Sequence, residues 1–173
     1  MLVTPESIPV LQARTDLLFS TITATDKARV IIYLYDTGIL CAPSYPTLKN
    51  LDLQGIDLSN LNLPQISLSG ANLAEAELKN CNLSAAVLNQ ANFKGANLNS
   101  ANLCKANLNQ SDLQEAKLHR ANLSHTSIAD ANLTDANLWS ADLQGSTITK
   151  PQLDSAKSSA YAILPDHLSD PNN

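Results

Sequence analysis

The thiols are the first groups in this chain that could act as nucleophiles or hold a metal. They belong to three cysteines, Cys41, Cys81 and Cys104. So odd and sparse a set is not a disulfide framework, and no CxxC pair indicates a zinc site. Cys104 is predicted to face solvent with no base nearby to activate it, and Cys81 is predicted to face inward. We therefore predict no catalytic cysteine.

Histidines are the next candidates for acid–base chemistry or metal binding. The chain has three, His119, His125 and His167. The first two are predicted on different faces of the molecule and the third in the C-terminal tail, so they do not converge as ligands. The sequence also lacks the GxGxxG, P-loop, HExxH and GxSxG motifs. These observations predict a protein that is not an enzyme and that uses no metal or cofactor.

The charge balance narrows the classes of partner. The 173 residues, enough for one domain, carry 11 basic and 16 acidic side chains, a net charge of −5. No stripe of Lys and Arg is visible that could neutralise phosphates, so direct nucleic-acid binding is not expected. Residues Met1 to Thr15 show no signal-peptide pattern, and the longest apolar run, Val30 to Tyr35, is too short to cross a bilayer. We expect a cytoplasmic protein without membrane contact.

An internal repeat of five residues organises most of the chain. Every fifth residue from Leu48 to Leu153 is large and apolar, which makes 22 centres in one register. The residue two before each centre is large at Leu51 and Ile56 and turns small from Ala71 onward. The residue between the two is usually Asn or Asp. The unit is therefore Ala-Asn-Leu-x-x.

A period of five fits neither a helix nor a continuous strand. Two side chains two residues apart point to the same side of an extended backbone, so Ala and Leu face one interior. The next inward pair follows only after a bend, which predicts a coil with corners. Glycines fall two residues after a centre, as at Gly55 and Gly95, and Pro64 falls one after, the slots that a type II turn prefers. Asn suits such a chain because it tolerates left-handed geometry and bonds nearby backbone.

The repeated Ala-Asn/Asp-Leu-x-x register over residues 46–157 resembles the pentapeptide-repeat family. The resemblance implies an all-β solenoid, a right-handed quadrilateral parallel β-helix with four pentapeptides in each coil and about five coils in all. Such a rod is filled by its own side chains and encloses no substrate pocket. Each coil contacts its neighbours, as in other solenoids.

The flanking segments are predicted to cover the open ends of the rod. Residues 1–45 lack the repeat and form a predicted N-terminal helical cap. One helix is expected over residues 10–22, with Leu11, Leu18 and Ile22 on one side. A second is expected from Thr25-Asp26 to Gly38, with Ile31, Leu34 and Tyr35 on one face.

The C-terminal end is predicted to close in a similar way. Thr149-Lys150-Pro151 reads as a helix entry with proline in the first turn. Residues 158–173 form a closing segment and tail, in which Ile163 and Leu164 are expected to plug the last coil. The residues after about His167 are polar and are expected to be disordered.

The carboxylates gather on one predicted face. Centres twenty residues apart share a face, and one face carries six acids against a single base, Lys94. This predicted acidic docking face consists of Asp52, Glu75, Asp112, Glu115, Asp135 and Asp154. A one-signed face would steer a basic partner, although uneven charge on a solenoid also arises by chance. Glu115 and Asp135, about one coil apart, could also meet a divalent cation, but no dedicated calcium loop is present.

Trp139 is the candidate aromatic contact on the surface. It follows a centre by one residue and is therefore expected to point outward, one coil above His119. An exposed Trp can anchor a partner. The other interpretation is that Trp139 packs against the C-terminal cap.

Three hypotheses about function follow. The first is a rigid scaffold or interaction module that binds an unknown protein partner with a basic surface. The second comes from the family resemblance: a DNA-mimic modulator of a type II topoisomerase, DNA gyrase, although such rods are more acidic and pair through their C-terminal ends. The third is an enzymatic or metal-dependent activity located in the caps, suggested by the unassigned purpose of the 45 N-terminal residues. With both ends capped, we expect a monomer.

Overall fold

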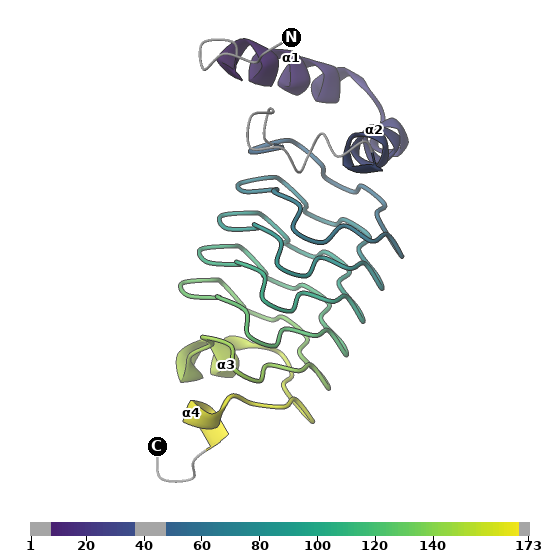
Figure 1. Cartoon of the computed structure of the whole chain (residues 1–173). Helices are drawn as coiled ribbons and strands as arrows, with labels where there is room; N and C mark the ends of the chain where they lie inside the picture. The colour runs from purple at the N-terminus through teal and green to yellow at the C-terminus, as the bar shows by residue number, and fades with distance from the viewer. Residues whose placement is uncertain (1–7, 37–47, 170–173) are drawn as a thin grey trace.

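The computed structural model describes residues 8–36 and 48–169, and the side chains from residue 15 onward. Two helices, α1 (Ile8–Thr21) and α2 (Ala24–Asp36), lie at one end of a stack of rungs (Figure 1). Two short helices, α3 (Lys150–Ser155) and α4 (Asp166–Ser169), lie at the other end. Between them the chain winds as a coil whose turns stack on one another.

Backbone pairing connects residues twenty apart. Parallel bridges join Asp52 to Asn72, Asn72 to Asn92 and Asn92 to Asp112, and the same spacing continues around the coil. Each bridge is a single residue long, so within the described residues the pairing is a set of isolated bridges. Twenty residues are four pentapeptides, which is the period that the resemblance implied.

The interior is filled as the repeat predicted. All 22 centres from Leu48 to Leu153 are buried, and so are the small residues two before them from Ala71 to Ser146. These inward columns form one apolar cluster with Phe19 and Ile31 of the N-terminal helices. Removing this apolar surface from water is the main favourable contribution to folding.

The corners fall two residues after each centre. Gly55 and Gly95 have φ of 65° and 68°, and the non-glycine corner residues have the same geometry, for example Arg120 at 57°. The N–H of Ala76 donates to the carbonyl of Leu73 across one such corner, at 3.1 Å. A positive φ at the third residue alone is the pattern of a type II turn. The predicted turn slots are confirmed.

The Asn in the middle of each repeat was expected to tolerate left-handed geometry and to bond nearby backbone, and only the second expectation is met. It lies in the extended bridge and has no positive φ, so left-handed tolerance does not explain it there. The hydrogen bonds of its side chain explain why Asn occupies this position. The Oδ1 of Asn92 accepts from the N–H of Lys94 at 3.0 Å, and its amide donates to Asn72 of the preceding coil at 2.9 Å. The side chain thus supports a corner and connects two coils.

The N-terminal helices partly follow the prediction. Helix α2 begins at Ala24, and Thr23 caps it by accepting from the N–H of Asp26 at 3.2 Å. Ile31 is buried as expected, and the expected stop at Gly38 lies outside the described residues. In α1 the predicted face is wrong, because Leu18 is 46% exposed while its neighbour Phe19 is 1% exposed. The larger side chain of Phe19, and not that of Leu18, is buried in the core.

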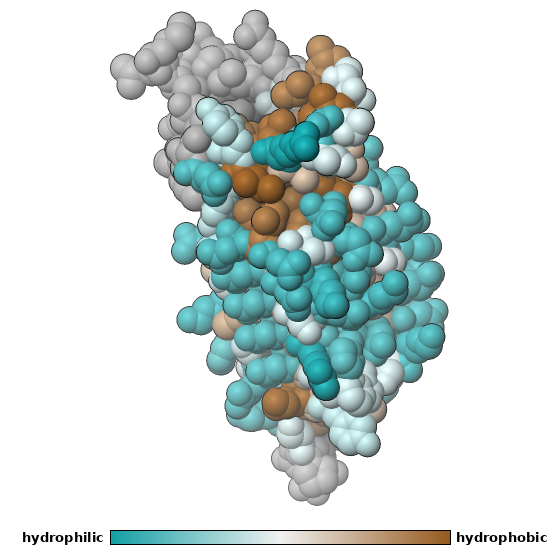
Figure 2. Space-filling model, turned by 90° about the vertical axis from the view of Figure 1, so that its right-hand side faces the viewer, coloured by the Kyte–Doolittle hydropathy of each residue, from teal (hydrophilic) through white to brown (hydrophobic). Residues whose placement is uncertain are grey.

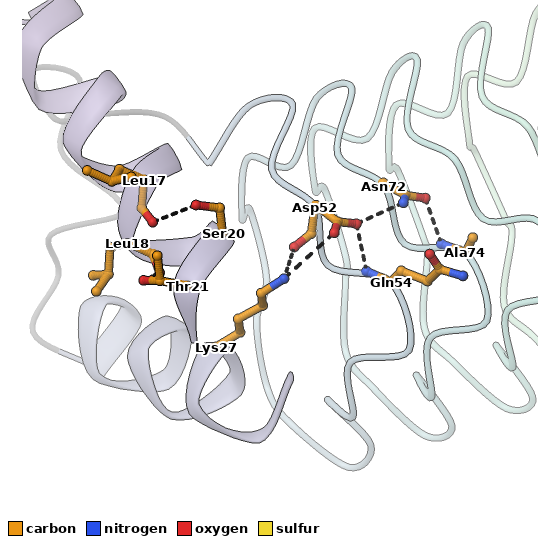
Figure 3. A network of polar contacts seen from close by, with 9 residues as sticks. All are labelled: Leu17, Leu18, Ser20, Thr21, Lys27, Asp52, Gln54, Asn72 and Ala74. Atoms are coloured by element: carbon orange, nitrogen blue, oxygen red, sulfur yellow. Dashed lines mark hydrogen bonds and ion pairs between the residues drawn. The ribbon is translucent and has the colours of Figure 1, made fainter. Parts of the chain in front are cut away.

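Side chains of α2 bond to the first coil at places where a further coil would pair. Lys27 is 8% exposed, and its Nζ donates to the carbonyl of Asp52 at 2.6 Å (Figure 3). Tyr35 donates its hydroxyl to the carbonyl of Pro64 at 3.1 Å. Inside the stack the corresponding carbonyls accept from backbone N–H groups of the preceding coil. The two side chains therefore satisfy carbonyls at the edge of the ladder.

Helix α3, near the C-terminal end of the rod, forms as predicted. Thr149 caps it, Gln152 completes a capping box, and Pro151 lies in the first turn. The side chain of Gln152 also donates to the carbonyls of Ile128 and Ala131, both at 2.9 Å. It thus plays the same part at this end of the ladder as Lys27 at the other end.

The closing segment continues the ladder with an offset of one residue. Ser158 bridges Asn137 and Ile163 bridges Asp142, each a spacing of 21. Ile163 therefore takes the outward position of a repeat and is 56% exposed, so its predicted role as a plug is wrong. Leu164 packs against the core, as expected.

The prediction of disorder after about His167 is wrong as far as Ser169. Helix α4 extends to that residue, and Leu168 packs against the core. Residues 170–173 lie outside the described part of the chain.

Candidate docking face

Three carboxylates of the predicted face stand in one corner column. Glu75, Glu115 and Asp135 have φ of 59°, 59° and 58°, and all three are exposed. Gly55 and Gly95 occupy the same column. We call Glu75, Glu115 and Asp135 the acidic ridge. Since the residues that follow them are inward-facing alanines, the ridge side chains project from the rod into solvent.

The backbone of the acidic ridge is held by bonds between coils. The N–H of Glu75 donates to the carbonyl of Lys94 at 2.9 Å, and the N–H of Glu115 donates to Thr134 at 2.9 Å. The N–H of Asp135 donates to Ser155 at 3.0 Å. The ridge is therefore carried by a fixed scaffold and not by a loose loop.

The other three predicted acids are engaged within the molecule. Asp52 accepts from the amide of Asn72 at 2.9 Å, and its Oδ2 lies 3.9 Å from Nζ of Lys27 (Figure 3). Asp112 accepts from the amide of Asn132 and from the N–H of Gln114. Asp154 pairs with Lys150 on helix α3. The acidic character that remains for a partner is concentrated in the acidic ridge.

Within the described residues, one base forms an ion pair with the ridge. Nζ of Lys94 is 4.0 Å from Oε1 of Glu115, and both side chains are about half exposed. A pair of this kind at the surface contributes little, about 0 to 1 kcal/mol, because solvent screens it. Lys94 therefore weakens the negative potential of the acidic ridge but does not cancel it.

Trp139 forms part of an aromatic cluster. Its ring stacks on that of His119, with centroids 4.6 Å apart and planes 10° apart. The ring of Tyr161 makes an edge-to-face contact with Trp139, with centroids 5.6 Å apart. Tyr161 belongs to the closing segment, so this is the packing contact that the sequence left as one of two alternatives. Tyr161 itself was missed, because the one-residue offset hides its register.

Cys81, Cys104, His119 and His125 lie where the repeat placed them. Cys81 is buried among the small inward residues, and burial raises the pKa of its thiol to about 12. Cys104 is half-buried on an outer face, and Cys41 lies outside the described residues. His167 contacts the carbonyl of Ile148 at 2.8 Å. Within residues 8–36 and 48–169, no three His, Cys, Asp or Glu side chains gather in a way that could hold a metal ion.

The face of the stack that Figure 2 presents is mainly polar. Figure 2 shows hydrophilic residues over most of the rungs and apolar ones gathered at the N-terminal helices and the coils next to them. Among the described residues, no helix has both the length and the apolar character needed to cross a bilayer. Asp57, close to the ridge in the next outward column, has a lowered pKa because the N–H and side chain of Ser59 bond its carboxylate.

Comparison with known proteins places the repeat in a family. The model for pentapeptide repeats, in eight copies, matches residues 52–90, 91–128, 111–149 and 126–157, which together span more than half of the chain. A search of curated proteins found no match.

Several solved structures resemble the chain. The pentapeptide repeat protein Rfr23 from the cyanobacterium Cyanothece 51142 is 25% identical, with a TM-score of 0.44, over 65% of this chain and 90% of its own. The pentapeptide repeat protein alr5209 from Nostoc PCC 7120 is 24% identical, with a TM-score of 0.37, over 82% and 89%. QnrB1, a plasmid-mediated fluoroquinolone resistance protein, is 15% identical, with a TM-score of 0.31, over 70% and 83%.

Proposed function

The chain belongs to the pentapeptide-repeat family, whose fold is a right-handed β-helix, and on that premise we propose that it is a non-catalytic interaction module. Its acidic ridge docks a protein partner with a basic surface. The observation that carries the proposal is the column of three exposed carboxylates on one corner of a rigid rod.

The charge of the ridge supports recognition of a basic surface. Carboxylates of one sign, aligned in one corner column, attract a complementary patch and speed its encounter with the rod. Asp135 forms no ion pair within the described residues, nor does Glu75. Both charges are therefore left for a partner.

Capture from native lysate tests the proposal. The bait is the full chain, compared with a variant in which Glu75, Glu115 and Asp135 are changed to Lys. A matched control changes three exposed acids elsewhere, Asp36, Asp130 and Asp166, to Lys and so has the same net charge. A partner retained by the wild type and the control but lost by the ridge variant supports docking. Equal capture by all three refutes it.

A DNA-mimic role at DNA gyrase is the alternative that uses the same carboxylates. It predicts inhibition of gyrase supercoiling by the wild-type protein and loss of that inhibition in the ridge variant. Lack of inhibition at a large molar excess removes this alternative and leaves the docking proposal standing.

The ends of the rod complete the proposal. Residues 1–45 act as an N-terminal cap and residues 158–173 as a closing segment, and the protein is a cytoplasmic monomer. The side chains that bond edge carbonyls, Lys27, Tyr35 and Gln152, support the capping roles. A satisfied edge does not template a further strand.

A further inference from the structure

A polar groove lies beside the acidic ridge, and we infer that it binds an extended peptide segment with a cationic and an acidic side chain two residues apart. The inference rests on the proposed function, because the groove includes Glu115 and Asp135 of the ridge. The groove is an open depression of about 750 Å³. Besides these two acids, it is lined by two bases, Lys117 and Lys157, together with His119 and Asn137.

The lining charges stand in parallel columns along the rod. Glu115 is a corner residue, and Asp135 is the corner residue of the next coil. Lys117 follows Glu115 by two residues and bridges Asn137 in the ladder. Two residues of extended chain span about 6.6 to 6.8 Å, and neighbouring rungs are about 4.8 Å apart. The groove therefore has an acidic side and a basic side about one dipeptide apart.

A bulge brings the second base into the groove. The N–H of Lys157 donates to the carbonyl of Ala136 at 2.9 Å, while the carbonyl of Ser158 accepts from Leu138 at 2.7 Å. In a regular rung one residue makes both bonds, so Lys157 and Ser158 together face the single residue Asn137. Such a bulge re-aims a side chain and is frequent beside functional sites. Here the ladder continues beyond the bulge with the one-residue offset, and the side chain of Lys157 lines the groove.

The opposite charges in the groove do not neutralise one another. Among the described residues, Lys117, Lys157 and Asp135 take part in no ion pair, and Glu115 meets only Lys94, at 4.0 Å. Both signs are thus presented to a ligand. A ligand with a single sign of charge that filled the whole groove would satisfy one side and meet repulsion from the other.

An extended peptide matches this spacing. Side chains two residues apart in a strand point to the same side and lie about 6.6 to 6.8 Å apart. A segment that lies along a rung can therefore place a cation over Glu115 and Asp135 and a carboxylate over Lys117 and Lys157. A segment whose two charges are on adjacent residues presents them on opposite sides and can place only one of them.

Two synthetic peptides of equal composition test the inference. Both are blocked heptapeptides of Ser and Thr with one Arg and one Glu, two residues apart in the first and adjacent in the second. Trp139 is the only tryptophan of the chain, and it stacks on His119 at the edge of the groove. Its fluorescence reports binding, and calorimetry confirms it. We expect the first peptide to bind about tenfold more tightly than the second.

Charge reversal locates the site. Lys117→Glu with Lys157→Glu is expected to lower the affinity for the first peptide by about tenfold or more, because attraction becomes repulsion. Lys79→Glu with Lys105→Glu has the same net charge outside the groove and is expected to leave it unchanged. Equal binding of the two peptides, absence of binding at millimolar concentration, or equal effects of the two double variants would overturn the inference.

The two proposals can fail separately. A captured partner that is lost by the ridge variant, together with no spacing preference of the peptides, leaves docking intact and refutes the groove. Selective peptide binding without any captured protein supports the groove and refutes docking of a partner from that lysate.

Discussion

The ammonium group of Lys27 lies 2.6 Å from the carbonyl oxygen of Asp52 and takes the position of a backbone donor from a further coil. Within the stack, the carbonyl of Asn72 accepts from the N–H of Leu53 at the equivalent place. Asp52 is on the first coil of the described stack, so no backbone N–H of a further described coil reaches its carbonyl. The helix thus completes the ladder with a side chain.

Replacing Lys27 by methionine should reveal the value of this bond. The apolar stem is retained, but the carbonyl of Asp52 loses its charged donor. We expect the free energy of unfolding in urea to fall by about 1 to 3 kcal/mol. Arg29→Met is the matched control, because Arg29 is exposed and, among the described residues, its one ion pair is with Asp26 at the surface. Equal effects of the two changes would contradict the assignment.

The ladder of middle asparagines predicts graded losses of stability. Asn92→Asp keeps the oxygen that accepts from Lys94 but loses the amide that donates to Asn72, whereas Asn92→Ala loses both bonds. We expect Ala to lower the free energy of unfolding by about 1 to 3 kcal/mol, since each bond contributes about 0.5 to 1.5 kcal/mol. Thermal and urea unfolding measure the order. A more stable Asn92→Ala variant would show that the ladder does not stabilise the rod.

Alanine variants of two corner glycines distinguish the cost of a positive φ from the cost of a steric clash. In Gly95→Ala the new Cβ lies 3.8 Å from the nearest side chain atom, Cγ of Glu75, so only the positive φ of 68° opposes it. We expect a loss of about 1 to 2 kcal/mol. Gly70→Ala has the same φ penalty, and its Cβ also collides with the side chain of Asn50. It should therefore be the less stable of the two in urea unfolding, and the reverse order would be inconsistent with the corner geometry.

The raised pKa of Cys81 predicts that the protein loses stability at alkaline pH. Its pKa is raised from 9.0 to about 12 by burial, so the folded protein keeps the thiol proton where the unfolded chain releases it. This contribution is complete below pH 9 and is lost as the pH rises from 9 toward 12, with a limiting slope of about 1.4 kcal/mol per pH unit. Cys81→Ala should flatten this part of the stability curve. Alkylation followed by mass spectrometry should label Cys104 well before Cys81.

Much of the rod could be predicted because its rule is local. A large residue every fifth position, with a small residue two before it, specifies which side chains face inward, and every centre is buried. Corners and turn slots follow from the same rule, whereas the period of twenty came from the resemblance to the pentapeptide-repeat family. The helix entry at Thr149 was predictable because a capping box and an early proline act within a few residues.

The candidate site was harder to predict from the repeat. Arithmetic on the register places six acids on one face, but it does not show that Asp52 bonds Asn72 and lies near Lys27, or that Asp154 pairs within helix α3. The groove depends on the bulge at Lys157 and Ser158, where the register shifts by one residue. No signal in the five-residue pattern marks that shift, because the pattern ends at Leu153.

The amino-acid sequence by itself determined the coil, its filled interior and the positions of its corners, since these depend on side-chain size and on contacts that repeat every five and every twenty residues. The tertiary structure alone decided how the coil ends: that Phe19 rather than Leu18 enters the core, that Lys27 and Gln152 satisfy edge carbonyls, and that Ile163 points outward. The physical reason is that an end lacks a neighbouring coil. Its unpaired carbonyls and exposed apolar floor accept whichever side chains the flanking segments bring within reach.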